Sequence, residues 1–229
     1  MKIMEFKQLS FQDSGKVFFI RIDPEDLTQT LNDVLKSLMN LSWISKFDEE
    51  YEKSAFESRA KKTIEDIKYK FSKCSDDNIT KDAGEYVVSE LSRKAIVNQL
   101  KYLDIPIGEL LGKKKSGNPG FDFHSQNTTT DTIIFGEAKY KSRSTAYSSA
   151  IPQIKVFIND KKDIEDLPEL KPFCTPKALR RANSGNKGFA AAFSARSTKS
   201  EKIISSITAM EDFSFLSKFD ELILVAVNL

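Results

Sequence analysis

An almost continuous apolar run near the C-terminal end constrains the fold of this chain most strongly. Residues 221–227 read ELILVAV. A strand with one face in water alternates apolar and polar residues, whereas a strand buried on both faces is apolar along its length. The run therefore predicts a strand that is covered on both faces.

The rest of the chain alternates between strand-like and helix-like segments. Runs rich in β-branched and aromatic residues predict strands at 16–22, 121–125, 132–140 and 188–193. Apolar residues that recur every three or four positions predict helices at about 23–38, 45–71, 81–103, 145–161 and 201–210. Residues 166–177 contain prolines and predict an irregular connection. This alternation is typical of the α/β or α+β class, with a mixed sheet flanked by helices.

The chain has 229 residues, which allows one large domain or two small ones. It contains no internal repeat and no low-complexity linker. We therefore expect residues 1–78 to form an N-terminal strand-helix extension that packs on a core of residues 79–229 in one compact unit.

Composition excludes several classes of protein. The 35 Lys and Arg residues nearly balance the 33 Asp and Glu residues, so any nucleic-acid site must come from local clusters of charge. Two cysteines and one histidine cannot assemble the usual Cys/His zinc site. No apolar run has the length of a signal peptide or a membrane span. We expect a soluble, cytoplasmic protein with no membrane partner.

Three charged residues stand out in the two central predicted strands. Glu137 and Lys139 are two positions apart, so both side chains lie on one face of their strand. A hairpin between the neighbouring strands would bring Asp122 close to them. Paired carboxylates suit a hard divalent cation such as Mg²⁺, and a lysine beside them can orient an attacking water or stabilise charge on a phosphate.

Four elements in a fixed order make this pattern more specific. A helix carries Gly84-Glu85, one strand carries GFDF at 120–123, the next carries GEAK at 136–139, and a following helix carries Gln153. This order resembles the PD-(D/E)xK nuclease superfamily over roughly residues 80–161. The resemblance implies a restriction-endonuclease-like mixed sheet.

The same resemblance implies roles for individual residues. Asp122, Glu137, the main-chain carbonyl of Ala138 and the helix-borne Glu85 would bind Mg²⁺ or Mn²⁺. Lys139 would position the attacking water, which makes Asp122, Glu137 and Lys139 the expected catalytic residues.

The order GE…GFDFH…IIFGEAKY is also similar to the nuclease subunit of the Hachiman anti-phage defence system. That family pairs a small nuclease with a helicase encoded beside it. The similarity implies a DNA nuclease whose activity is restrained or directed by a helicase partner. The chain itself has no GxxxxGK[ST] nucleotide-binding loop, so an ATPase motor would belong to the partner.

The chain departs from the superfamily pattern at three places. Phe121, not proline, precedes Asp122, and Phe157 replaces the tyrosine of the QxxxY element, so only Gln153 carries over. In the helix of the superfamily a second acid usually follows the GE sequence three positions later, whereas here the next acid is Glu90, five positions after Glu85. On a helix these two side chains point about 140° apart, so one of them reaches the metal, and Glu85 is preferred.

Further residues are candidates for accessory roles. His124 lies two positions beyond Asp122, so it is expected on the same side of the strand, as a phosphate contact, a general base or the partner of a nearby acid. The expected contacts to the DNA backbone are Lys113, Lys114, Lys115, Lys141 and Arg143.

Each assignment has a plainer alternative. Backbone amides could hold Asp122, Glu137 and Lys139 could be a surface pair, and Glu85 could be an acid that stabilises the helix dipole. Glu90, Gln153 and the lysine run could simply face solvent. The protein could also be a nuclease of restriction, repair or RNA processing, or a non-catalytic nucleic-acid-binding or assembly subunit that docks through its charged helix at 48–70.

Overall fold

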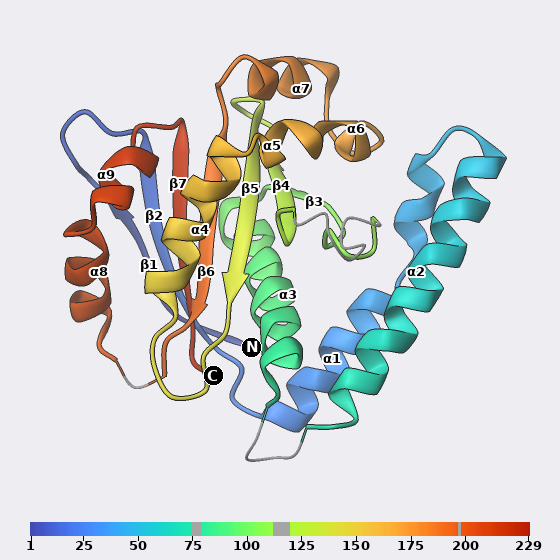
Figure 1. Cartoon of the computed structure of the whole chain (residues 1–229), viewed down its shortest axis with the longest axis horizontal. Helices are drawn as coiled ribbons and strands as arrows, with labels where there is room; N and C mark the ends of the chain where they lie inside the picture. The colour runs from blue at the N-terminus through green and yellow to red at the C-terminus, as the bar shows by residue number, and fades with distance from the viewer. Residues whose placement is uncertain (75–78, 112–119, 197) are drawn as a thin grey trace.

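A seven-stranded mixed β-sheet forms the centre of the molecule (Figure 1). The computed structural model of the chain describes residues 1–74, 79–111, 120–196 and 198–229. The strands lie across the sheet in the order β1-β2-β7-β6-β5-β4-β3. Their bounds are β1 Lys2–Leu9, β2 Lys16–Asp23, β3 Leu103–Asp104, β4 Phe123–Asn127, β5 Thr132–Lys139, β6 Gly188–Ser194 and β7 Glu221–Val227.

Pairing directions divide the sheet into a parallel centre and antiparallel edges. Strands β2, β7, β6 and β5 are parallel to one another in that order. Strand β1 joins one edge in the antiparallel direction, and β4 and β3 join the other. Every residue of β7 is buried, so the predicted two-sided burial of residues 221–227 is confirmed.

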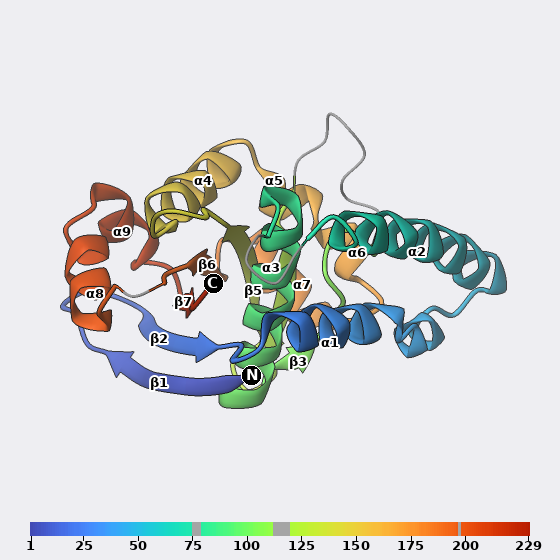
Figure 2. The same ribbon diagram turned by 90° about the horizontal axis from the view of Figure 1, so that it is seen from below.

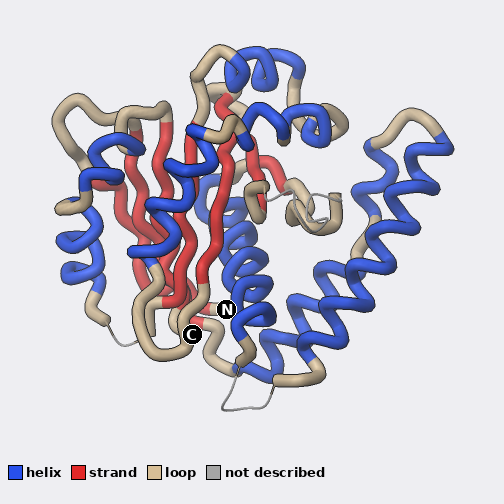
Figure 3. Tube along the Cα trace, viewed as in Figure 1, coloured by secondary structure: helices blue, strands red, loops and turns tan. Residues whose placement is uncertain are grey.

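Helices pack on both faces of the sheet, which appears as a layer of red strands in Figure 3. Neighbouring residues of one strand, such as Leu224 and Val225, belong to different apolar clusters because side chains alternate between the faces. The helices are α1 Leu27–Met39, the 3₁₀ helix η1 Ser42–Lys46, α2 Glu50–Phe71, α3 Lys81–Leu100, α4 Tyr147–Asn159, α5 Lys162–Glu165, α6 Leu167–Leu170, α7 Pro176–Asn183, α8 Ser200–Thr208 and α9 Glu211–Leu216.

The first apolar cluster joins the sheet to α1, α2 and α3, and the second joins it to α4 and α6–α9. Seen from below, α1 and α2 extend from the sheet on the side opposite α8 and α9 (Figure 2). The mixed sheet flanked by helices confirms the predicted α/β or α+β class. Among the helices of the described ranges, none is both long and apolar enough to cross a membrane.

The expected N-terminal extension contributes directly to the sheet. Strand β2 pairs with β7, and the described residues of α1 and α2 share an apolar cluster with α3. Strand β1 was not predicted, because its residues are mostly exposed and include Lys2, Glu5 and Lys7. It lies at an edge of the sheet, so its pairing with β2 rather than burial defines it.

The structure corrects one end of each of two predicted helices. Helix α3 ends at Leu100 instead of residue 103, because Lys101 adopts a left-handed backbone conformation with φ of 58°. The next residues then pair with β4 as β3. Helix α2 begins at Glu50 instead of residue 45, after the separate 3₁₀ turn η1.

The segment 166–177 is also more regular than expected. It contains α6 and the start of α7, whose N-cap Thr175 accepts a hydrogen bond from the backbone N–H of Ala178 at 3.1 Å. Short helices of this kind lack the repeated apolar spacing that would reveal them in a sequence.

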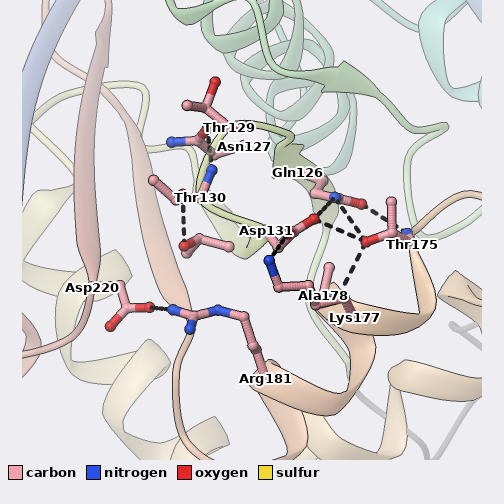
Figure 4. A network of polar contacts seen from close by, with 11 residues as sticks. Gln126, Asn127, Thr129, Thr130, Asp131, Thr175, Lys177, Ala178, Arg181 and Asp220 are labelled. Carbon is pink, nitrogen blue, oxygen red and sulfur yellow. Dashed lines mark hydrogen bonds and ion pairs between the residues drawn. The ribbon is translucent and has the colours of Figure 1, made fainter.

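Side-chain contacts fix the tip of the β4–β5 hairpin (Figure 4). Gln126 accepts from the N–H of Thr175 at 3.1 Å, and Asp131 accepts from the hydroxyl of Thr175 at 3.1 Å and pairs with Lys177 at 2.8 Å. The hairpin is thereby attached to the first turn of α7. Because one slipped residue would turn every side chain to the other face, this anchor helps to fix which residues reach the opposite end of the hairpin.

A buried ion pair within α3 is hydrogen-bonded to α1 of the extension. Glu90 is fully buried and accepts two hydrogen bonds of 2.8 Å from Arg93 and a further one from Ser37 of α1. Burial opposes the charged form, but Arg93 and Ser37 outweigh it and lower the pKa of Glu90. The expectation that Glu90 faces solvent is therefore wrong, and so is its accessory role at a metal, because its carboxylate is bonded to Arg93 and Ser37.

We expect Glu90→Gln to lower the free energy of unfolding by about 2–3 kcal/mol at pH 7, because the buried Arg93 would lose one of its two carboxylate partners among the described residues and keep only Asp104. The pKa of Glu90 is lowered in the folded state, so its stabilisation is present above pH 4.5, the usual pKa, and is lost as pH falls through the folded pKa. Urea denaturation should therefore show the two proteins converging as the pH falls below 4.5. A difference that stays constant with pH would contradict the ion pair, and Glu57→Gln on α2, whose side chain is 47% exposed and paired, within the described ranges, only with Lys61, is the matched control.

Candidate active site

The candidate site lies where the parallel strands end. Strand β5 ends at Lys139, β6 at Ser194 and β7 at Val227, so the segments that follow them leave the sheet at the same end, the carboxyl end of the parallel strands (Figure 1). The first turn of α3 lies at this end of the sheet, because Gly84 packs against the ring of Tyr140 just beyond β5. Ligands of open α/β sheets bind at the carboxyl ends of the strands.

Asp122 is held at the start of β4 by the neighbouring strand. Its backbone N–H donates to the carbonyl of Gly136 at 2.8 Å, and its carboxylate accepts from the N–H of Ala138 at 2.7 Å. The side chain is buried. A backbone amide does therefore hold Asp122, as the plainer alternative expected, and this bond fixes the carboxylate beside the segment that carries Glu137 and Lys139.

Glu137 and Lys139 form a direct ion pair at the end of β5. The Glu137 side chain is 2% exposed and that of Lys139 is 26% exposed, so the pair is not the surface pair of the plainer alternative. Burial alone would lower the pKa of Lys139, but the charges of Glu137, Asp122 and Glu85 outweigh it and raise that pKa. These charged groups are therefore neighbours, and the lysine is an ammonium at neutral pH.

Two glycines allow this close arrangement. A Cβ at Gly84 would lie 2.3 Å from the ring of Tyr140, and a Cβ at Gly136 would lie 2.2 Å from the ring of Phe123. Each glycine precedes a candidate acid, Glu85 or Glu137. Glycine at position 84 therefore lets α3 approach Tyr140, the residue after β5, and glycine at position 136 lets the Phe123 ring pack on β5.

A surface pocket of about 570 Å³ opens beside the ion pair. Glu85 and Lys139 line it together with the cationic residues Lys81, Lys141 and Arg143. Lys141 and Arg143 are two of the expected backbone contacts, whereas Lys81 was not singled out, because a lysine in the first turn of a helix has no distinctive sequence signal. The other expected contacts, Lys113, Lys114 and Lys115, lie outside the described residues.

His124 is bonded to an acid that the sequence did not reveal. Its Nε2 lies 3.0 Å from a carboxylate oxygen of Asp166, and both side chains are buried. This contact matches the alternative that His124 is the partner of a nearby acid. The two residues are far apart in sequence, so only the fold brings them together.

Gln153 lies in α4, partly buried, on a helix that packs against β5 and β6. Phe157 of the same helix packs edge-to-face on Phe121, with 5.3 Å between the ring centres. The two phenylalanines that depart from the superfamily pattern are thus in contact, as parts of the core.

The chemistry of the donors fits a divalent cation. Asp122 and Glu137 are buried carboxylates, and Lys139, which is paired with Glu137, supplies one positive charge, so the three groups leave a net negative charge for a cation to neutralise. The N–H of Ala138 points to Asp122, and the carbonyl of the same strand residue points to the same side. Within the described ranges, His, Cys, Asp and Glu form no group of three or more that could hold a metal. The residues that could hold a divalent cation are Asp122, Glu137 and this carbonyl, with Glu85 nearby.

Comparison with known proteins yields no matching family model, curated protein or solved structure.

We expect Gly84→Ala to destabilise the protein by about 1–3 kcal/mol, because the new methyl group would overlap the Tyr140 ring. Urea denaturation measures this change. Tyr140→Ala removes the obstacle, so adding Gly84→Ala to that variant should cost much less than adding it to the wild type. Equal costs in the two backgrounds would show that contact with Tyr140 is not the reason for the glycine.

Proposed function

We propose that the protein is a metal-dependent nuclease that hydrolyses phosphodiester bonds in DNA. The observation that carries the proposal is the partly buried Glu137–Lys139 ion pair beside Asp122, at the edge of a pocket lined by further cations. Paired carboxylates next to an ammonium suit phosphoryl chemistry, because they hold a divalent cation and the phosphate charge at one place.

In this proposal Asp122, Glu137 and the Ala138 carbonyl hold Mg²⁺ or Mn²⁺. Glu85, whose charge acts on Lys139, assists directly or through water. The bound cation supplies the activation of water and the neutralisation of phosphate charge. Sites that use Mg²⁺ often combine one or two carboxylates with waters and substrate phosphates, which agrees with this small donor set.

Lys139 acts as a cation rather than as a general base. A base must be unprotonated to accept a proton, and the acids around Lys139 raise its pKa. Its ammonium therefore orients the attacking water or stabilises charge on the phosphate. Lys81, Lys141 and Arg143 hold neighbouring phosphates, which is binding to the backbone with little recognition of bases.

The more specific parts of the proposal, which are the type of nuclease fold, the biological role and the partner, rest on the sequence. The order of the GE, GFDF, GEAK and Gln153 elements supports a restriction-endonuclease-like fold and a role in anti-phage defence. We propose a helicase or other ATPase as the partner that controls access to DNA, since the chain has no GxxxxGK[ST] loop. RNA is the alternative substrate, because contacts to phosphates do not by themselves distinguish it from DNA.

Asp122→Ala, Glu137→Ala and Lys139→Ala should each lower cleavage of plasmid and linear DNA by at least about 100-fold in Mg²⁺ or Mn²⁺. Removing any of the three disrupts the charges that act on the phosphate. Circular dichroism should show that the variants remain folded, and Glu57→Ala on α2 should cleave like the wild type. Undiminished cleavage by either carboxylate variant would contradict the metal assignment, and RNA of the same sequence tests the choice of substrate.

A further inference from the structure

The segments that follow β5 and β6 are bonded into one unit. The hydroxyl of Ser194 accepts from the N–H of Lys141 at 3.0 Å and donates to its carbonyl at 3.2 Å. The N–H of Ala146 donates to the carbonyl of Ser194 at 3.0 Å, and the hydroxyls of Thr145 and Thr198 are 3.0 Å apart. The segment after β6 is therefore fixed next to the cationic segment after β5.

Arg21 of β2 fixes the same segment from the other side. Its guanidinium donates to the carbonyls of Arg196 and Thr198, each at 2.7 Å, and to the hydroxyl of Ser200 at 3.1 Å. It also donates to the side chain of Asn228, after β7, at 2.9 Å. Because the guanidinium is rigid and planar, these bonds determine the path of the backbone at Arg196.

Arg196 itself has a strained backbone and an exposed side chain. Its φ of 42° lies in the left-handed region, which a residue other than glycine adopts only when its surroundings hold it there. Ser194 and Thr198, which lie on either side of Arg196 in sequence, are bonded to Lys141 and Thr145 of the segment that lines the pocket, so Arg196 lies at the same end of the sheet as the pocket.

We propose that Arg196 binds a backbone phosphate on the β6 side of the site and that Arg21 is its positioning residue. This inference rests on the proposed function. The cations that line the pocket come from α3 and from the segment after β5, namely Lys81, Lys141 and Arg143. Arg196 adds a contact from the neighbouring strand, so a nucleic acid would be held by two adjacent segments, which fixes its position across the strand ends.

The test is binding of a fluorescein-labelled 20-base-pair DNA duplex, measured by fluorescence anisotropy in Ca²⁺ at several salt concentrations. Arg196→Ala should raise Kd about 3–10-fold and lower the slope of log K against log salt by about 0.9, the value for one phosphate contact. Lys62→Ala, which removes one positive charge from an exposed position of α2, should leave both quantities unchanged.

The positioning role is tested by a double-mutant cycle. Arg21→Ala should weaken binding about as much as Arg196→Ala, and the double variant should bind no more weakly than either single variant. Additive losses would contradict positioning of Arg196 by Arg21.

Wild-type Kd and salt slope in Arg196→Ala, with weaker binding by Arg143→Ala, would overturn the phosphate contact and leave the proposed function intact. No binding by the wild type would count against the proposed nuclease itself and the inference with it.

Discussion

The ion pair between the buried Glu137 and the half-buried Lys139, beside the Asp122 carboxylate, is the interaction on which the rest of the structure depends. Removing charges from water is costly, and a fold tolerates them only where partners surround them closely. The close packing at Gly84 and Gly136 brings α3 and β4 against β5 and so supplies those partners. Two carboxylates with one ammonium still leave negative charge, which a divalent cation would neutralise. Packing and proposed chemistry therefore require the same arrangement.

The parallel centre of the sheet determines what surrounds this pair. The four parallel strands, β5, β6, β7 and β2, end on the same side of the sheet, so segments that are distant in sequence meet there. Arg21, at the end of β2, can therefore bond to the segment after β6, and Ser194 of β6 can bond to the segment after β5. The antiparallel β4–β5 hairpin adds Asp122 at the same edge, because its first residues lie opposite the last residues of β5.

The sequence predicts those features of the structure that depend on residues close together along the chain. The apolar run of β7 predicts its burial, and the spacing of Glu137 and Lys139, with the hairpin before them, predicts their meeting with Asp122. Contacts between distant segments leave no such signal. The charged residue Glu90 looks solvent-exposed until Ser37 and Arg93 are seen to surround it, and Asp166 lies 42 residues beyond the His124 that it binds. Strand β1 exists only because an edge of the sheet is available to pair with it.

The measurement that tests the central claim most directly is isothermal titration of the purified chain with Mn²⁺. It reports on the carboxylate pair without requiring a partner protein or an active conformation. The account predicts that the wild type and Glu57→Gln bind Mn²⁺ equally, and that Asp122→Asn and Glu137→Gln, while still folded, lose this binding. Mn²⁺ binding that survives in both of these variants, or is missing from the wild type, would contradict a metal site at Asp122 and Glu137.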